Sequence, residues 1–500
     1  MSHNSNTIPI RQRLPLRFIH ASGLFLDRVI EYIPEMTGSW ESRFLDISRR
    51  ATTQLFNKAL DEMVDFIIIS GDVLNATISP PGLFVFLAEQ FEKLNKAGIQ
   101  VYWTGAEFDS PDDMPISFPL PDNVHHFPTN SIQEYYFKRA DNYPNSVLAK
   151  IIGISRNQRQ RKIRSSEFPI DPARIFTIAI ANGDIDPESL SQRRIDYWAL
   201  GGQNDRTTYQ GNPRKKNSDG KPIPLDPITT TDNTKREKKD PTPPPFIVHY
   251  PGSTVALNPK MIGQYGATIV EVISGEEPQL NFFQTSPIRW INEQITINEN
   301  INGIEQLKEE LQSRIKIYQN TQKNEDLMIN WFINTTHPSQ LSTTLRKESV
   351  VKDILDELRK EFGQYEKNEP IAWSVDIAVI PPDSMPKQLY EQQTILGDFL
   401  REIKHQQDEL DQIIDLRKFI PTKLKENNQD EKLNNYDKIL LANQIIDPNT
   451  NEIKLTQTNE QIELKQEILK KAATIATELL NNENPTQFTI NLNNDEKEIL

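Results

Sequence analysis

The stretch DFIIISGDVLN, residues 65–75, places four apolar residues in a row and then stops at Gly71 and Asp72. A short, continuous, β-branched run of this kind is typical of a strand that is buried on both faces, as in a parallel sheet. The glycine and aspartate that follow indicate a turn at the carboxyl end of the strand.

The flanking sequence repeats the same alternation of strand and helix. Strands are predicted over 16–22 (LRFIHAS) and 99–104 (IQVYWT), and amphipathic helices over 43–64 and 82–98. This β-α-β-α-β order predicts parallel strands joined by right-handed crossovers, with a site at their carboxyl ends. The turns Ser22–Asp27, Gly71–Asn75 and Gly105–Ser110 are therefore expected to line one crevice.

Further apolar runs predict five more strands, expected to form a second sheet, at 174–182, 196–202, 246–253, 266–274 and 279–286. Residues 205–245 are rich in Pro, Thr, Lys and Asp, which predicts a flexible loop inserted in this domain. The predicted domains are a disordered stretch over 1–15, an α/β domain over 16–287, an α+β capping domain over 288–420 and a polar helical tail over 421–500.

The capping domain is predicted from helices at 303–319 and 350–363 alternating with strands at 326–334 and 371–382. One long amphipathic helix is predicted over 390–415. Its residues Tyr390, Ile395, Leu396 and Phe399 are expected near one face, which serves either internal packing or the docking of a partner helix.

Composition restricts the class of protein. The net charge is −14, which disfavours indiscriminate nucleic-acid binding but leaves room for a local basic groove. The absence of cysteine excludes disulfides, thiolate zinc sites and cysteine nucleophiles. No apolar signal-peptide core and no apolar stretch of about 20 residues is present, so we expect a cytoplasmic protein that does not associate with a membrane.

The ordered set of these segments, together with LPDNVHHFP (120–128) and HYPGS (249–253), resembles the SbcD-type DNA repair exonucleases of the calcineurin-like metallophosphoesterase superfamily. The resemblance covers residues 16 to about 407. It implies a four-layer α/β sandwich, with two β-sheets flanked by helices, then an α+β capping domain and a helical C-terminal extension. It also implies two manganese ions, cleavage of DNA ends and an SbcC-like coiled-coil ATPase partner. A homodimer is a further expectation.

The resemblance also locates the ligand positions, and most of them are changed. Where the family has Asp-x-His the chain has Gly23 and Phe25, whereas Asp72 retains the Gly-Asp motif. The remaining positions carry Glu107 for asparagine, Phe108 for the catalytic histidine, Asp109 at the end of that motif, Asn182 for a histidine, and Gly202 and Asn204 in place of Gly-His-x-His.

Two divalent ions need a shell of several charged ligands, so this set predicts no resident cofactor and no manganese-dependent hydrolysis. If the protein is active, Mn²⁺ or Mg²⁺ is the expected ion. One alternative is a single Mg²⁺ held by Asp72, Glu107 and Asp109 with help from Asn182 and Asn204, since Mg²⁺ prefers oxygen ligands. Another is that Asp72 caps its own turn.

Basic residues and histidines offer other candidates. Arg156, Arg159, Arg161, Lys162 and Arg164 are candidate DNA contacts, with a solvated loop as the alternative. His20 is expected to be a hydrogen-bonded core residue. His125 and His126 are expected to point to opposite faces of a strand, which makes them a poor chelate.

The sequence thus favours a catalytically degenerate, SbcD-like protein that binds DNA or acts as a scaffold in DNA repair or DNA-end processing. The alternatives are an active metal-dependent DNA exonuclease or phosphoesterase with a remodelled site, and a protein-interaction scaffold unrelated to DNA.

Overall fold

The computed structural model divides the chain into two compact units, the first of which contains the chain up to Ile291 together with Gln322–Met328 and Tyr365–Ala372. The structure describes residues 16–30, 44–118, 120–139, 147–157, 163–170, 175–190, 193–210, 246–273, 278–297, 301–322, 325–335, 340–345, 347–363, 370–380, 385, 387–408, 466, 468–474 and 476–477. The predicted disordered stretch 1–15 and most of the tail 421–500 lie outside these ranges.

The first sheet is built around the stretch that opens the sequence analysis. Its strand order is β12-β11-β1-β2-β3-β4. The bounds are β1 (Leu16–Ala21), β2 (Phe66–Ser70), β3 (Gln100–Thr104), β4 (Val124–His126), β11 (Gly266–Val272) and β12 (Gln279–Gln284). Strands β1 to β4 are mutually parallel, as predicted for the first three.

Two strands predicted for the second sheet belong to the first instead. Strand β11 pairs antiparallel with β1, from Leu16 opposite Val272 to His20 opposite Thr268, and β12 pairs antiparallel with β11. The physical reason is that β10 (Ile247–Tyr250) already has neighbours on both sides in the second sheet. The chain after β10 therefore crosses to the first sheet and pairs along the other side of β1.

The second sheet has the order β5-β6-β7-β8-β10-β9. The sequence analysis missed β5 (Gln133–Phe137) and β6 (Ala149–Gly153), and found β7 (Phe176–Asn182), β8 (Tyr197–Gly201) and β10. The predicted loop 205–245 begins with strand β9 (Thr207–Gln210), which pairs antiparallel with β10. Residues 211–245 lie outside the described part of the chain.

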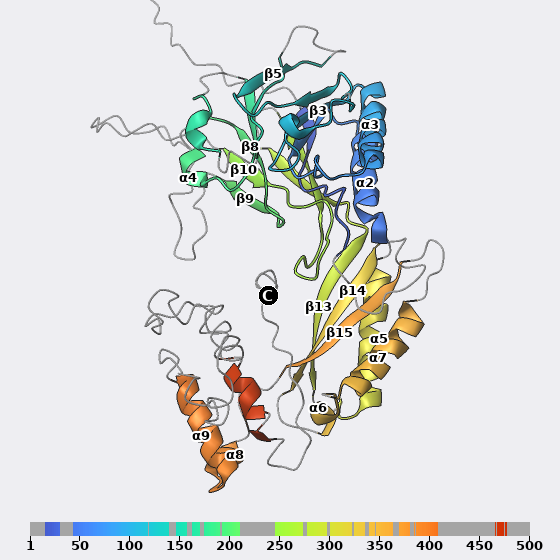
Figure 1. Cartoon of the computed structure of the whole chain (residues 1–500), viewed down its shortest axis with the longest axis vertical. Helices are drawn as coiled ribbons and strands as arrows, with labels where there is room; N and C mark the ends of the chain where they lie inside the picture. Colours follow the sequence, from blue (N-terminus) through green and yellow to red (C-terminus); the bar gives the residue numbers. More distant parts are fainter. Residues whose placement is uncertain are drawn as a thin grey trace, which may run out of the picture. The chain divides into compact units, whose positions relative to one another are not determined.

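The layers follow from the alternation of side chains along the strands. Phe18 of β1 points into the core between the two sheets, whereas its neighbour Ile19 packs on the outer face of the first sheet. Helices α2 (Ile47–Asp61) and α3 (Pro81–Lys96) lie side by side on that outer face (Figure 1). The far face of the second sheet is covered by Ile163, Phe168 and the short helix α4 (Pro187–Leu190). This is the predicted metallophosphoesterase-type sandwich.

Two neutral histidines lie between the sheets and form the inter-sheet histidine pair, His20 and His249. His20 is fully buried and hydrogen-bonded to Tyr197 Oη at 3.0 Å and Ser70 Oγ at 2.9 Å, so the prediction of a core histidine is confirmed. His249 is hydrogen-bonded to Thr208 Oγ1 at 2.8 Å and to Thr268 Oγ1 at 2.9 Å. Both residues therefore connect the first sheet to the second.

The second unit contains most of a three-stranded sheet of order β13-β14-β15 with helices α5 and α7 on one face (Figure 1). The bounds are β13 (Ile288–Ile297), α5 (Ile304–Thr321), β14 (Asp326–Thr335), α6 (Gln340–Leu345), α7 (Glu348–Phe362) and β15 (Ala372–Ile380). The buried Arg359 of α7 donates to the carbonyls of Ser374 and Val375 and lies over the Trp373 ring, which anchors the helix to β15.

The long helix predicted over 390–415 is instead two helices, α8 (Lys387–Glu391) and α9 (Ile395–Asp408). The Thr394 hydroxyl accepts a hydrogen bond from the Gly397 amide at 3.2 Å, as a helix N-cap does. The break leaves the carbonyl oxygens of Tyr390 and Gln392 without helical partners. The Arg401 guanidinium donates hydrogen bonds to both of them. Residues 409–415 lie outside the described ranges.

The face predicted on this helix is also divided. Leu396 is buried in a small cluster with Leu469 and Ala473 of the tail, and Tyr390 packs against it. Ile395 and Phe399 are 77% and 40% exposed. Within the described part of the chain, no helix combines the length and apolar character needed to span a membrane.

Candidate crevice at the carboxyl ends of the strands

The turns after β1 and β2 are joined by main-chain hydrogen bonds. The Gly23 amide donates to the Gly71 carbonyl at 3.1 Å, and the Phe25 amide donates to the Asp72 carbonyl at 3.1 Å. All four residues have positive φ angles, between 46° and 86°. A Cβ on Gly71 would come within 2.5 Å of Asn182 Nδ2, so this position accepts only glycine.

The turn after β3 joins the same group. The Ala76 amide donates to the Phe108 carbonyl at 2.8 Å, and the Asp72 amide donates to Asp109 Oδ1 at 3.3 Å. The structure therefore brings together the three turns that the sequence analysis assigned to one crevice.

The Asp109 carboxylate is hydrogen-bonded within the protein and has no oxygen left for a ligand. It is fully buried, and each of its oxygens accepts two hydrogen bonds. Oδ1 accepts from the amides of Asp72 and Ala106, and Oδ2 accepts from the Val73 amide and the Trp103 indole. Burial and the neighbouring Asp72 carboxylate raise the pKa of Asp109 to about 7. These four donors occupy the oxygens that a metal ion would need.

Asp72 lies beside Asn182, the last residue of β7. Asn182 Nδ2 donates to Asp72 Oδ2 at 2.8 Å and to the Ser70 carbonyl at 2.9 Å. Burial raises the pKa of Asp72, while the hydrogen bond from Asn182 and the guanidinium groups of Arg156 and Arg28 act in the opposite direction. The Asp72 carboxylate accepts its hydrogen bond from Asn182, whereas the amides of its own turn, Asp72 and Val73, donate to Asp109. The predicted capping of this turn is therefore carried out by Asp109, and Asp72 interacts electrostatically with two arginines.

Those two arginines reach the crevice from different elements. The Arg156 amide, just after β6, donates to the Gly105 carbonyl at 2.9 Å, and its guanidinium pairs with Glu107 at 3.4 Å. The Arg28 guanidinium stacks 4.3 Å from the centre of the Phe25 ring. Of the other predicted DNA contacts, Arg164 is exposed at the start of the helical turn Ser165–Glu167, and Arg159, Arg161 and Lys162 lie outside the described residues.

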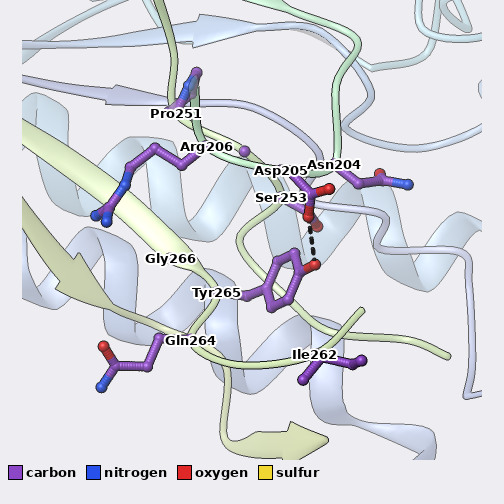
Figure 2. Close-up of a pocket in the computed structure, with 10 residues that line it drawn as sticks. Asn204, Asp205, Arg206, Pro251, Ser253, Ile262, Gln264, Tyr265 and Gly266 are labelled. Carbon is purple, nitrogen blue, oxygen red and sulfur yellow. Dashed lines mark hydrogen bonds between the residues drawn. The ribbon is translucent and has the colours of Figure 1, made fainter. Parts of the chain in front are cut away.

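Asn204 and Gly202 do not add ligands to this group. Gly202 has no side chain, and Asn204 lines a pocket of about 60 Å³ that includes neither Asp72 nor Asn182. In Figure 2 the Tyr265 hydroxyl points at Asp205, to which it donates at 2.8 Å, while Arg206 extends away from this hydrogen bond. The pocket has room for a few water molecules.

A two-metal site does not fit these residues. Among the residues that the structure describes, no three Asp, Glu or His side chains are grouped so that they could hold a metal ion. His125 and His126 contribute nothing, because His126 stacks on Trp103 at 4.0 Å and His125 stacks on Tyr102 at 5.0 Å. This agrees with the prediction that the pair is a poor chelate.

Comparison with known proteins gives an independent view of the family. No family model matches the chain. The chain is 24% identical over 369 residues to a Bacillus subtilis (strain 168) protein described as the uncharacterized metallophosphoesterase YhaO, a match that spans 71% of this chain and 79% of that protein. The two six-stranded sheets flanked by helices form a metallophosphoesterase sandwich, and this relative supports placing the chain in the metallophosphoesterase superfamily.

Proposed function

We propose that the protein is an SbcD-like member of the superfamily that binds DNA in repair or DNA-end processing without metal-dependent cleavage. The observation that carries this proposal is the state of the two carboxylates in the crevice. Asp109 is occupied by four protein donors, and Asp72 is held by Asn182 beside two arginines.

The chemistry of phosphodiester hydrolysis explains why this matters. Two metal ions activate the attacking water and stabilise both the attacking and the leaving oxygen. Arginines can neutralise a phosphate, but a guanidinium does not generate a hydroxide at neutral pH. Arg28 and Arg156 therefore support binding of a phosphate group and leave the cleavage step without its nucleophile.

The test uses the full-length protein with labelled DNA. We expect binding that weakens with salt and no cleavage in Mn²⁺ or Mg²⁺. Arg156→Ala is expected to weaken binding severalfold, whereas Arg49→Ala, on α2, serves as the matched control. Cleavage that requires Mn²⁺ and disappears in Asp72→Ala would establish the remodelled exonuclease instead.

A second candidate, a protein-interaction scaffold, has one observation in its favour. Ile395, Phe399 and Ile468 are 77%, 40% and 41% exposed around the cluster formed by α9 and the tail. Such a surface suits a coiled-coil partner of the SbcC-like kind or a second copy of the chain. Sedimentation of the protein alone and with a candidate ATPase, compared with Phe399→Glu, distinguishes the two occupants.

A further inference from the structure

We infer that the crevice binds an unpaired nucleobase, stacked on an aromatic platform formed by Phe108 and by Arg28 lying on Phe25. This inference rests on the proposed DNA-binding function and specifies the form of DNA that the crevice takes. Aromatic rings and guanidinium planes stack on bases without regard to sequence, and they are the usual contacts to single strands.

The two aromatic residues are fixed on either side of one short segment, Asp72–Ala76. The Phe25 amide donates to the Asp72 carbonyl at its start, and the Phe108 carbonyl accepts from the Ala76 amide at its end. Main-chain hydrogen bonds on both sides hold the backbone of the two residues in place before a ligand arrives, which limits the entropy lost on binding.

Phe108 is available to a ligand, because the residue is 39% exposed in the turn after β3. Phe25 is half-buried, and the exposed Arg28 covers its ring at 4.3 Å. The accessible surface at Phe25 is therefore the plane of a guanidinium, which stacks on bases and also contacts phosphate.

The charges around the platform explain why stacking contributes beside phosphate attraction. Arg156 is paired with Glu107, and the charge of Arg28 is offset by the nearby carboxylate of Asp72. Both arginines therefore contact a phosphate with part of their charge already compensated, and stacking adds a contact that does not depend on charge. A duplex hides its base faces and offers mainly phosphates, so single strands are the form that benefits from Phe108.

The experiment measures binding of the full-length protein to an oligothymidine of about 12 nucleotides and to a blunt duplex of about 20 base pairs, by fluorescence anisotropy. Phe108→Ala is expected to weaken single-strand binding about tenfold, the contribution of one stacked base, and to change duplex binding less than about twofold. Phe108→Leu keeps an apolar side chain without the aromatic face and is expected to match the alanine variant.

Two controls make the result specific. Tyr136→Ala removes an aromatic side chain of comparable exposure, 51%, from β5 and is expected to leave both affinities unchanged. Glu107→Gln removes the partner of Arg156 and is expected to tighten binding of both DNA forms severalfold. Circular dichroism on each variant confirms that the fold is retained.

The outcomes separate this inference from the proposed function. If the wild-type protein binds single strands and Phe108→Ala binds them equally well, the stacking platform is wrong while DNA binding stands. If the wild-type protein binds neither form of DNA, both the proposed function and the platform are overturned.

Discussion

The inter-sheet histidine pair and the crevice both contain buried polar side chains. They differ in how fully these side chains are hydrogen-bonded within the protein. Between the sheets, both nitrogens of His20 and of His249 have hydrogen-bond partners within the protein. In the crevice only Asp109 is saturated in this way. Phe108 and Arg28 remain exposed, and Glu107 is half-exposed.

The difference lies in how the buried charges of the crevice are compensated. A buried carboxylate must find donors or a cation, because an uncompensated charge in the protein interior is costly. Asp109 has found four N–H donors, and Asp72 has found an amide and two guanidinium groups at longer range. Groups of the protein itself thus compensate both carboxylates.

Asp109→Asn is expected to cause the largest change in the free energy of unfolding. Each oxygen of Asp109 accepts two N–H groups, so the amide nitrogen of asparagine would face two donors in either orientation. Two unsatisfied buried donors lower the free energy of unfolding by about 3 kcal/mol, measured by urea denaturation. Asp113→Asn, at an exposed aspartate, is the control, and equal midpoints for the two variants would contradict the structural role.

The next largest effect is expected from pH. The pH dependence of the free energy of unfolding tests whether the inter-sheet pair stays unprotonated in the folded protein. Burial and the Arg206 charge lower the pKa of His249 from 6.5 to about 3. Below pH 6.5 the unfolded chain takes up a proton that the folded protein does not. Stability is therefore complete above pH 6.5 and is lost as the pH falls towards 3, by about 2 kcal/mol at pH 5 for this residue.

The raised pKa of Asp109 acts in the opposite sense, because the folded protein then holds a proton that the unfolded chain releases as the pH rises from about 4 to about 7. The comparison is therefore between wild type and His249→Gln at each pH. The variant is expected to lose less stability between pH 6.5 and 5, and parallel curves would show that His249 is protonated in the folded state.

Asp72→Asn is expected to have the smallest effect. Asparagine adopts the left-handed backbone at this position, φ 61°, as readily as aspartate, and its oxygen can still accept from Asn182. Because burial raises the pKa of Asp72, removing the charge costs little. The free energy of unfolding should change by less than about 0.5 kcal/mol, and a loss comparable to that in Asp109→Asn would mean that the two carboxylates are equivalent.

The strands that the sequence predicted well are those with a continuous apolar run within one short segment. The run Phe66–Ser70 is apolar on both faces, and it is buried on both faces in β2. Three strands of the two sheets were missed, β5, β6 and β9, and two of them, β5 and β9, lack a continuous buried run. The break between α8 and α9 was also missed, because Thr394 caps the second helix within an otherwise continuous helical pattern.

Sequence alone therefore determined the sandwich fold and the meeting of three turns at one crevice. Both follow from the periodicity and the order of the predicted segments. The replacement of ligand residues at Gly23, Phe25 and Phe108 stays a prediction that rests on the family resemblance. Only the tertiary structure decided that β11 returns to β1 and that Asp109 is saturated. The amide donors to Asp109 include Val73, 36 residues away in sequence, and strand pairing and hydrogen bonding of that kind depend on which segments fold against one another.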